Sequence, residues 1–552
     1  MTNDEGGHGK ASPSVPESFG VPLLGRATGA MAVATALSRF TGVVRIFALA
    51  YALGSAGLAD TYNLANTVPN VVHDIVLGGV LAATFVPVFV ERLATRSKDE
   101  AWEAISAVVT VAFVVMAVAS VLFLIAAPVI VDALTILGKG ANTGVQRSVA
   151  TDLLRLFVPQ LACYGLASVA TALLNTRQKF VMPMVAPIAN NLVMIVILLW
   201  FGSVVQHPSL AELQSHNSQI LLLGIGTTLG VVVQALLLIP SLRRANLHLR
   251  WHLSFRHEAV RTVMRLSGWT LGLVVSNQLA LVVVLAFAVR VGTGAVSAYT
   301  YAYTFFQLPF GVVAVSIMSA STPDLAARWS TGDLPGFRRR LAVGIRAMLA
   351  IIVPAAAMEL VLARPVVALV LGHHATSAST TLGTSQALTM LALGIPGFCL
   401  FLYSARALQA MQDLRTTFWL YALENGINIA AVILLAGPLG VRGIALSISI
   451  AYSISAVVAL VVIRRRLKGL STGLVARPLA RVLAATAALL IAAALASNVT
   501  ASDSTPALLL RVALGGASGV AVYLASAGVL AAVLPSLGLR QHGRHTSRGR
   551  LG

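Results

Sequence analysis

Charged residues are scarce in this chain, and their scarcity indicates its class. Only 11% of the 552 residues are Asp, Glu, Lys or Arg, while 57% are hydrophobic. Soluble domains carry about 25% charged residues, so this chain lacks the polar residues that a soluble surface needs. Its long apolar runs can cross a bilayer only as helices or a closed barrel, and their lengths of roughly 20 residues favour helices. We therefore expect an all-α polytopic membrane protein.

Cysteine and acidic residues are also sparse. The two cysteines, Cys163 and Cys399, both lie in apolar runs, which excludes a disulfide framework and a cysteine-based metal site. The net charge is +20, but most basic residues lie in short loops between apolar runs, where they set membrane orientation. We therefore expect no nucleic-acid partner. The sequence has neither a phosphate-binding GxxxxGK[ST] loop nor a His/Cys cluster with metal-ligand spacing, so we expect no catalytic residues, no metal and no enzymatic activity.

The apolar runs predict about fourteen transmembrane helices. The first two lie within residues 31–91. The others lie at about 102–131, 148–174, 181–205, 219–240, 262–289, 295–322, 342–371, 380–411, 416–436, 440–463, 478–498 and 506–534. A basic loop follows each even-numbered span, which by the positive-inside rule places the even loops and both termini in the cytoplasm.

An internal repeat divides the chain. Residues 159–191 align without gaps with residues 396–428. Residues 54–69 also resemble residues 292–309, and both of these segments end at a proline. Parallel repeats of this kind predict two pseudo-symmetric six-helix lobes around a central cavity, with two further C-terminal helices. The predicted units are a disordered cytoplasmic tail (1–26), an N-lobe (27–240), a C-lobe (241–466), the two C-terminal helices (467–535) and a basic cytoplasmic tail (536–552).

Two arginines stand inside the first apolar run. Arg39 and Arg45 are six residues apart, which separates them by about 120° around a helix, so both can border one wide cavity. A charge at the membrane centre costs about 2.5–3.5 kcal/mol on insertion scales and therefore normally faces a wet cavity. Their positions predict an internal chamber that handles an anion. The alternative is a structural role, in which they pair with Asp60 or with helix-end carbonyls.

Further polar residues follow in the second span. Asn66, Asn70 and His73 recur at helical spacing, so they could line the same cavity. The alternative for His73 is a polar residue that is satisfied within the helix bundle. Asp60 lies at the first external turn and could serve as a gate, a helix cap or one half of an ion pair between the lobes.

Several long motifs resemble one known family. SRFTGVVR at 38–45, the spacing from Asp60 to Pro69-Asn70, and FVPVFVE at 85–91 resemble the opening of MurJ/MviN lipid II flippases. Residues 173–191, 306–315 and 405–417 resemble its later signatures. The resemblance implies the multidrug/oligosaccharidyl-lipid/polysaccharide exporter fold, with the last two helices forming a lipid groove. It also implies that the chain flips lipid II from the inner to the outer leaflet of the bacterial cytoplasmic membrane by alternating access.

The resemblance carries over to the cavity only in part. Well-known family members have an arginine at the position of His73 and another near Thr304, and both are absent here. Arg39 and Arg45 are therefore expected to bind the diphosphate of the substrate, helped by His73 and by Arg265 or Arg406. Arginine suits this ligand because its planar fork forms charge-assisted, often bidentate hydrogen bonds with phosphate.

A candidate cation site is also implied by the family. Some members bind sodium in span 11 with an acidic partner in span 7. Here Glu424 and Asn428 share one face of span 11, while the matching position in span 7, near Val284, is apolar. The driving force is thus expected to be Na+ or H+ coupling or the membrane potential, without another cofactor. The alternative for Glu424 is a buried polar contact between helices.

Two other functions remain open at this point. The chain could be an exporter of the same fold for another polyprenyl-linked glycan or a drug. It could also be a non-transporting membrane scaffold for cell-wall assembly. The expected partners are lipid II (the undecaprenyl-diphosphate-linked muropeptide), membrane lipids and cell-wall synthesis proteins.

Overall fold

In the part of the chain that it describes, the computed structural model consists of helices and the short non-helical segments that join them. The described residues are 21–54, 56–78, 89, 97–138, 143–177, 179, 181–205, 208–244, 250–372, 378–469, 473–499, 502 and 504–526. Within these ranges there is no strand, and 13 helical stretches are long and apolar enough to cross a membrane. The predicted all-α polytopic fold is therefore confirmed.

The second predicted span is described only in its first part. Helix α2 (Ala56–His73) continues into a π-helical turn, η1 (Asp74–Gly78). Residues 79–88 and 90–96, which include the motif at 85–91 except Phe89, lie outside the described residues, as do residues 1–20 and the basic tail. Helix α1 (Val21–Leu53) begins before the predicted N-lobe boundary at residue 27.

The remaining elements follow the predicted spans in order. They are α4 (Lys98–Thr135), α5 (Thr143–Thr176), α6 (Val181–Val204), the short α7 (Leu210–Ser215), α8 (Asn217–Arg243), α9 (Glu258–Val291), α10 (Ala295–Pro309), the π-helical turn η3 (Phe310–Ala314), α11 (Val315–Ser330), α12 (Leu334–Leu371), α13 (Ala378–Ala410), α14 (Leu414–Leu439), α15 (Val441–Arg466), α16 (Gly473–Ser497) and α17 (Thr505–Ala525).

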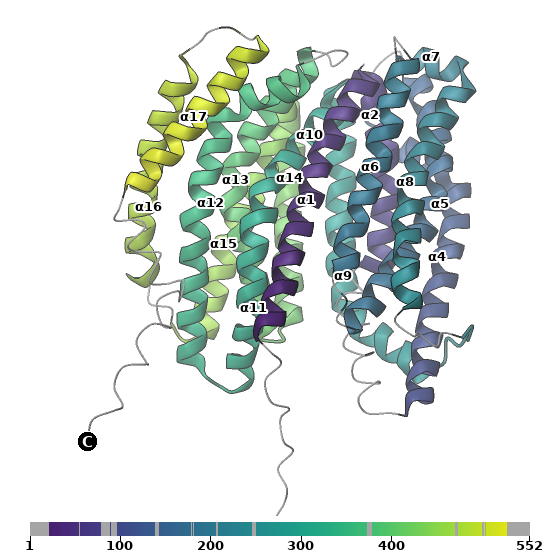
Figure 1. The fold of residues 1–552 in the computed structure, drawn as a ribbon, viewed down its shortest axis with the longest axis horizontal. Helices are drawn as coiled ribbons and strands as arrows, with labels where there is room; N and C mark the ends of the chain where they lie inside the picture. The colour runs from purple at the N-terminus through teal and green to yellow at the C-terminus, as the bar shows by residue number, and fades with distance from the viewer. Residues whose placement is uncertain are drawn as a thin grey trace, which may run out of the picture.

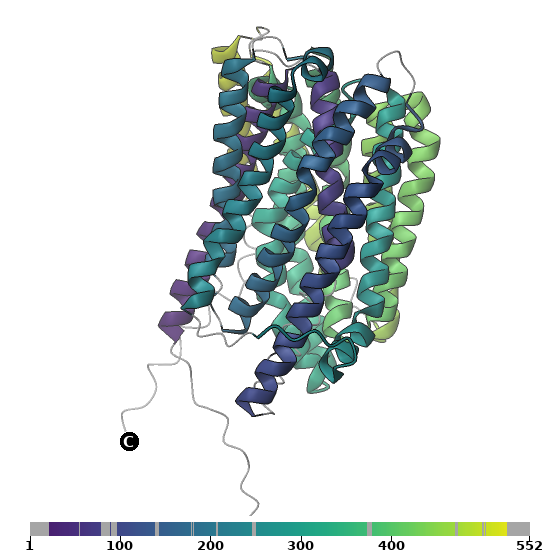
Figure 2. The same cartoon turned by 90° about the vertical axis from the view of Figure 1, so that its right-hand side faces the viewer.

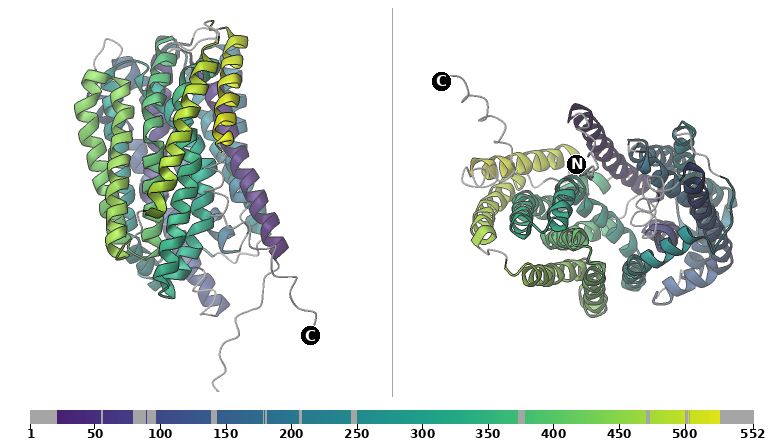
Figure 3. Two further views of the ribbon diagram at one scale, coloured as in Figure 1. Left: turned by 90° about the vertical axis from the view of Figure 1, so that its left-hand side faces the viewer. Right: turned by 90° about the horizontal axis from the view of Figure 1, so that it is seen from below.

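The helices form two groups side by side (Figure 1). One group contains α1, α2, α4, α5, α6 and α8, and the other contains α10 to α15. Helix α9 packs on α14 of the second group and on α4 of the first. Helices α16 and α17 pack on each other and on α12, and they lie at the edge of the molecule in Figure 3. We use N-lobe and C-lobe for the two groups, with α9 bridging them.

The internal repeat is visible in the packing. Helices α5 and α6 both pack against α8, and α13 and α14 pack in the same way against α15. Pro69 of α2 and Pro309 of α10 are each followed by a π-helical turn. Because proline has no N–H and frees a carbonyl in the preceding turn, a local change in helical winding beside it is expected.

Small residues let helices approach closely inside each lobe. A Cβ atom added at Gly226 would lie 2.3 Å from Ile197 Cγ2, and one at Gly394 would lie 2.5 Å from Ser449 Cα. Such close approach is how membrane helices gain packing energy in the absence of a hydrophobic driving force.

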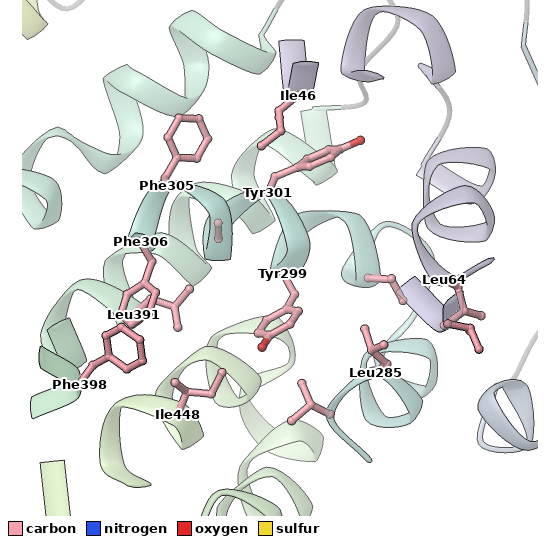
Figure 4. Packing of buried hydrophobic residues seen from close by; sticks show 14 of the residues in the cluster. Ile46, Leu64, Leu285, Tyr299, Tyr301, Phe305, Phe306, Leu391, Phe398 and Ile448 are labelled. Carbon is pink, nitrogen blue, oxygen red and sulfur yellow. The ribbon is translucent and has the colours of Figure 1, made fainter. Parts of the chain in front are cut away.

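Aromatic side chains fill the core of the C-lobe near the lobe boundary. In Figure 4, Phe306 of α10 lies beside Phe398 of α13, with ring centroids 5.0 Å apart. Ile46 of α1 and Leu64 of α2 belong to the same buried cluster. The two lobes therefore share apolar packing in this structure.

Candidate functional site

A cavity of about 420 Å³ lies between the lobes, bounded by α1, α6 and α10. Its lining is mostly polar and includes two cations and no carboxylate among the described residues. The lining residues are Thr35, Ser38, Arg39, Gly42, Arg45, Met184, Pro187, Asn191, Thr304, Gln307 and Leu308. Arg39 and Arg45 thus border one cavity, as their spacing along the helix predicted. Their role as substrate ligands stays a prediction.

Arg39 reaches from α1 toward α10. Its exposed side chain donates from Nη1 to Gln307 Oε1 over 3.4 Å. Its Nε lies beside Gly311, where an added Cβ would be 3.1 Å away. Among the described residues no carboxylate forms an ion pair with Arg39 or Arg45. The alternative of a pair with Asp60 is therefore not what the structure shows, and the guanidinium of Arg39 keeps donors for an anion.

Asn191 of α6 holds the segment of α1 that carries both arginines. Its Nδ2 donates to the Ser38 carbonyl at 3.2 Å and to Thr41 Oγ1 at 3.0 Å. Neither Asn191 nor Gln307 was among the predicted site residues. The signal was present in the sequence, since Asn191 is the repeat partner of Asn428.

Asp60 joins the two lobes at the start of α2. It is only 3% exposed, and its two carboxylate oxygens accept the backbone N–H groups of Gly294 (2.6 Å) and Ser297 (2.8 Å). Asn63 adds a bond from Nδ2 to Ser297 Oγ at 3.1 Å. Of the three roles predicted for Asp60, this geometry is a cap, because the carboxylate satisfies N–H groups at the first turn of α10. We call these four residues the interlobe clasp.

His73 lies in a polar network and not in the cavity lining. Its Nε2 is 2.8 Å from Ser168 Oγ of α5, and its Nδ1 is 3.2 Å from Asp74 Oδ1. Asp74 Oδ2 in turn accepts from Gln278 Nε2 of α9 at 3.0 Å. In this conformation His73 therefore matches the alternative reading of a satisfied polar residue. Its partner Ser168 was not predictable, because it comes from a helix far away in the sequence.

The other predicted substrate ligands also lie outside the cavity lining. Asn70 Nδ2 donates to the Asn66 carbonyl at 2.8 Å, a bond within α2. Arg265 is exposed on α9. The structure therefore brings together Arg39 and Arg45, with Thr304 opposite, but neither the asparagines nor Arg265.

Glu424 is buried inside the C-lobe. It is 1% exposed, and its Oε2 has no hydrogen-bond partner among the described residues. Asn428 instead accepts from Ser447 Oγ of α15 at 2.9 Å. The contact with α9 comes from the neighbouring Asn425, whose Nδ2 donates to Asn277 Oδ1 at 2.7 Å. The candidate cation pair thus contains one unsatisfied carboxylate and one amide that α15 already engages.

Comparison with known proteins assigns the family. The family model described as "Lipid II flippase MurJ" matches residues 49–514. The "Probable lipid II flippase MurJ" of Rhizobium meliloti (strain 1021) is 26% identical over 417 residues, which cover 75% of each chain.

Solved structures show the same fold. A lipid II flippase MurJ in an inward closed conformation matches with a TM-score of 0.74 at 21% identity, covering 92% of this chain and 99% of the other. A multidrug resistance MATE family transporter of the MOP superfamily, in an inward-facing conformation, matches with a TM-score of 0.64 at 15% identity, covering 78% and 98%. Because the family model matches most of the sequence, this chain belongs to the lipid II flippase MurJ family, which comprises transporters and not enzymes.

Proposed function

We propose that this chain carries lipid II from the inner to the outer leaflet of the bacterial cytoplasmic membrane, with Arg39 and Arg45 binding the diphosphate. The observation that supports this most is the cavity lined by both arginines and by no described carboxylate. The positive charges of such a lining attract an anion. They repel a cation, and no carboxylate in the lining offsets that repulsion in a partly desolvated site. The same charge argues against export of a cationic drug.

The size of the cavity suits part of the substrate. Its volume of about 420 Å³ is near the lower end of the roughly 300–1,000 Å³ that is usual for small-molecule sites. It matches a diphosphate with an adjoining sugar better than a complete sugar-peptide headgroup. The rest of the headgroup would then occupy space that opens when the lobes move, and the polyprenyl tail would remain in lipid.

The orientation of the chain sets which side is closed. The basic loops support cytoplasmic termini, and α1 then crosses to the outer side, where α2 begins. The interlobe clasp at the start of α2 and α10 therefore closes the outer side of this conformation. Alternating access would require the clasp to break as the cavity opens outward.

Glu424 is the proposed coupling residue. An ionised carboxylate that is buried without a partner is costly, so it binds a proton or a cation when the lobe is closed around it. We propose that H+ or Na+ binds at Glu424 and that its release accompanies lobe movement. The membrane potential would act on the same charge.

Complementation tests the proposed substrate and the cavity together. A host depleted of its own lipid II flippase is given this chain, and growth and outer-leaflet exposure of lipid II are measured. We expect rescue by the wild type, and loss of rescue in Arg39→Ala and Arg45→Ala at equal membrane expression. Arg265→Ala is the matched control, because it removes an arginine that lies outside the cavity lining, and it should rescue.

Two results would contradict the proposal. A well-inserted wild-type chain that restores no lipid II exposure would indicate a different cargo or a scaffold. Full rescue by both cavity variants would show that the arginines do not bind the diphosphate.

A further inference from the structure

The connection between α8 and α9 is held against α4 through hydrogen bonds from its backbone. Residues 250–254 are not helical, and two of their backbone N–H groups bond to side chains of α4. Arg250 N donates to Ser106 Oγ at 3.0 Å, and His252 N donates to Thr110 Oγ1 at 3.2 Å. In Figure 2 this teal segment crosses the lower end of the molecule. We call residues 250–257 the linker segment.

Large apolar side chains of the linker segment alternate with less exposed ones. Trp251, Leu253 and Phe255 are 69%, 52% and 53% exposed, whereas His252 and Ser254 between them are half-buried. Alternation of this kind follows from an extended backbone, in which successive side chains point to opposite sides. Trp251 and Leu253 therefore lie on one side of the segment, and Phe255, at the turn that follows, is exposed as well. We call these three residues the apolar row.

The row begins at the membrane-spanning surface of α4. The ring of Trp251 meets Phe113 of α4 edge to face, with centroids 5.8 Å apart, and Phe113 is itself 43% exposed. Tryptophan beside exposed apolar helix surface is typical of the membrane interface, where the ring lies at the depth of the lipid headgroups.

Exposed arginines flank the row. Among the described residues, none of the four forms an ion pair with a carboxylate. Glu103 of α4 faces His252 at 3.9 Å. The four arginines are Arg243, Arg244, Arg250 and Arg256.

We propose that the linker segment, together with Arg243 and Arg244, is an interfacial anchor that binds anionic phospholipids of the bilayer. Trp251, Leu253 and Phe255 enter the boundary between headgroups and acyl chains, while the arginines contact lipid phosphates. The three apolar side chains set how deeply the segment enters the bilayer, and the four arginines make it prefer anionic over neutral lipid, so the anchor requires both. The anchor is separate from the cavity and does not depend on which cargo is transported.

Site-directed spin labelling tests the alternation. The full chain, with Cys163→Ala and Cys399→Ala, receives one cysteine at a time at positions 251 to 255 and is placed in nanodiscs that contain phosphatidylglycerol. Nitroxides at 251, 253 and 255 should collide more with oxygen than with a water-soluble nickel complex. Labels at 252 and 254 should show the lower oxygen accessibility of a half-buried position. Equal values at all five positions, or free access of nickel to 251, 253 and 255, would overturn the proposal and leave a solvent-facing surface.

Lipid charge tests the arginines. The label at 253 should shift to greater depth in nanodiscs of phosphatidylglycerol than in nanodiscs of phosphatidylcholine. Replacing the four flanking arginines by glutamine should abolish that shift. A control variant replaces four other exposed arginines by glutamine: Arg339, Arg415, Arg464 and Arg465. A shift in label depth that is absent in the wild type, or that is lost equally in this control variant, would refute the anchor.

Discussion

Replacing Asp60 by alanine removes both carboxylate hydrogen bonds of the interlobe clasp. These bonds, at 2.6 and 2.8 Å to the N–H groups of Gly294 and Ser297, form only when the two lobes are together on that side. In an open state water can solvate the same groups. The substitution should therefore destabilise the closed state selectively and shift the conformational equilibrium.

The size of the shift follows from the two bonds. Loss of a helix cap costs about 0.5–2 kcal/mol, and a hydrogen bond to a charged group contributes about 1.5–3 kcal/mol. We take a range from about 1.5 kcal/mol for the cap alone to about 3 kcal/mol for two charge-assisted bonds. At a factor of ten for every 1.4 kcal/mol, the ratio of closed to open molecules should fall by about 10- to 150-fold.

Distance measurements between the lobes can detect this change. Spin labels at Gln214 of α7 and Leu439 of α14 are exposed reporters on opposite lobes. Double electron–electron resonance should show a longer-distance population in Asp60→Ala, and a smaller one in Asp60→Asn, which keeps one acceptor oxygen. Asp152→Ala is the matched control, because it removes a half-exposed carboxylate whose ion pair among the described residues is with Arg155 at 3.8 Å, and such pairs contribute little.

The refuting result is specific. If folded Asp60→Ala and wild type give superimposable distance distributions, the clasp does not set the balance between the two states.

Two further predictions concern acidic residues elsewhere in the C-lobe. Glu424→Gln should abolish the dependence of transport on the coupling cation or on pH while preserving folding; transport that stays cation-dependent would exclude Glu424 as the coupling site. At the turn before α12, the N–H of Gly336 and the guanidinium of Arg328 hold the pKa of Asp333 below its usual range. A carboxylate whose pKa is lowered in the folded state stabilises the fold at pH values above its unfolded-state pKa, and this stabilisation is lost as the pH falls through the folded-state pKa. Asp333→Asn should therefore reduce the thermal stability at pH 7. The difference in thermal stability from wild type should narrow in acid. A constant difference across pH, measured by melting in detergent, would contradict this.

The sequence predicted the fold well, because membrane spans appear as long apolar runs and the repeat appears as aligned residues. The proline positions also anticipated where α2 and α10 change their winding. Placement in the cavity was predictable for Arg39 and Arg45, since both lie on one helix whose geometry is fixed. It was not predictable for His73, because its partner Ser168 comes from another helix, as does Gln278, which bonds to the neighbouring Asp74. Contacts between distant helices depend on tertiary packing, which spacing along one helix does not reveal.

Arg265 shows a related limit. Arg265 was expected to help Arg39 and Arg45 bind the diphosphate, but its side chain is exposed on α9 and lies outside the cavity lining. Long basic side chains near a helix end can extend along the surface, so an arginine in an apolar span does not by itself identify a cavity residue.

The close packing inside each lobe has a consequence for how this transporter can evolve. At Gly226 or Gly394 an added methyl group would overlap a neighbouring helix, so a substitution there would disturb the packing that folding requires. At Asp60 or Asn63 a substitution removes hydrogen bonds that join the two lobes. Natural selection can therefore adjust how long the cavity stays shut on one side, one hydrogen bond at a time, without risking the architecture that forms it.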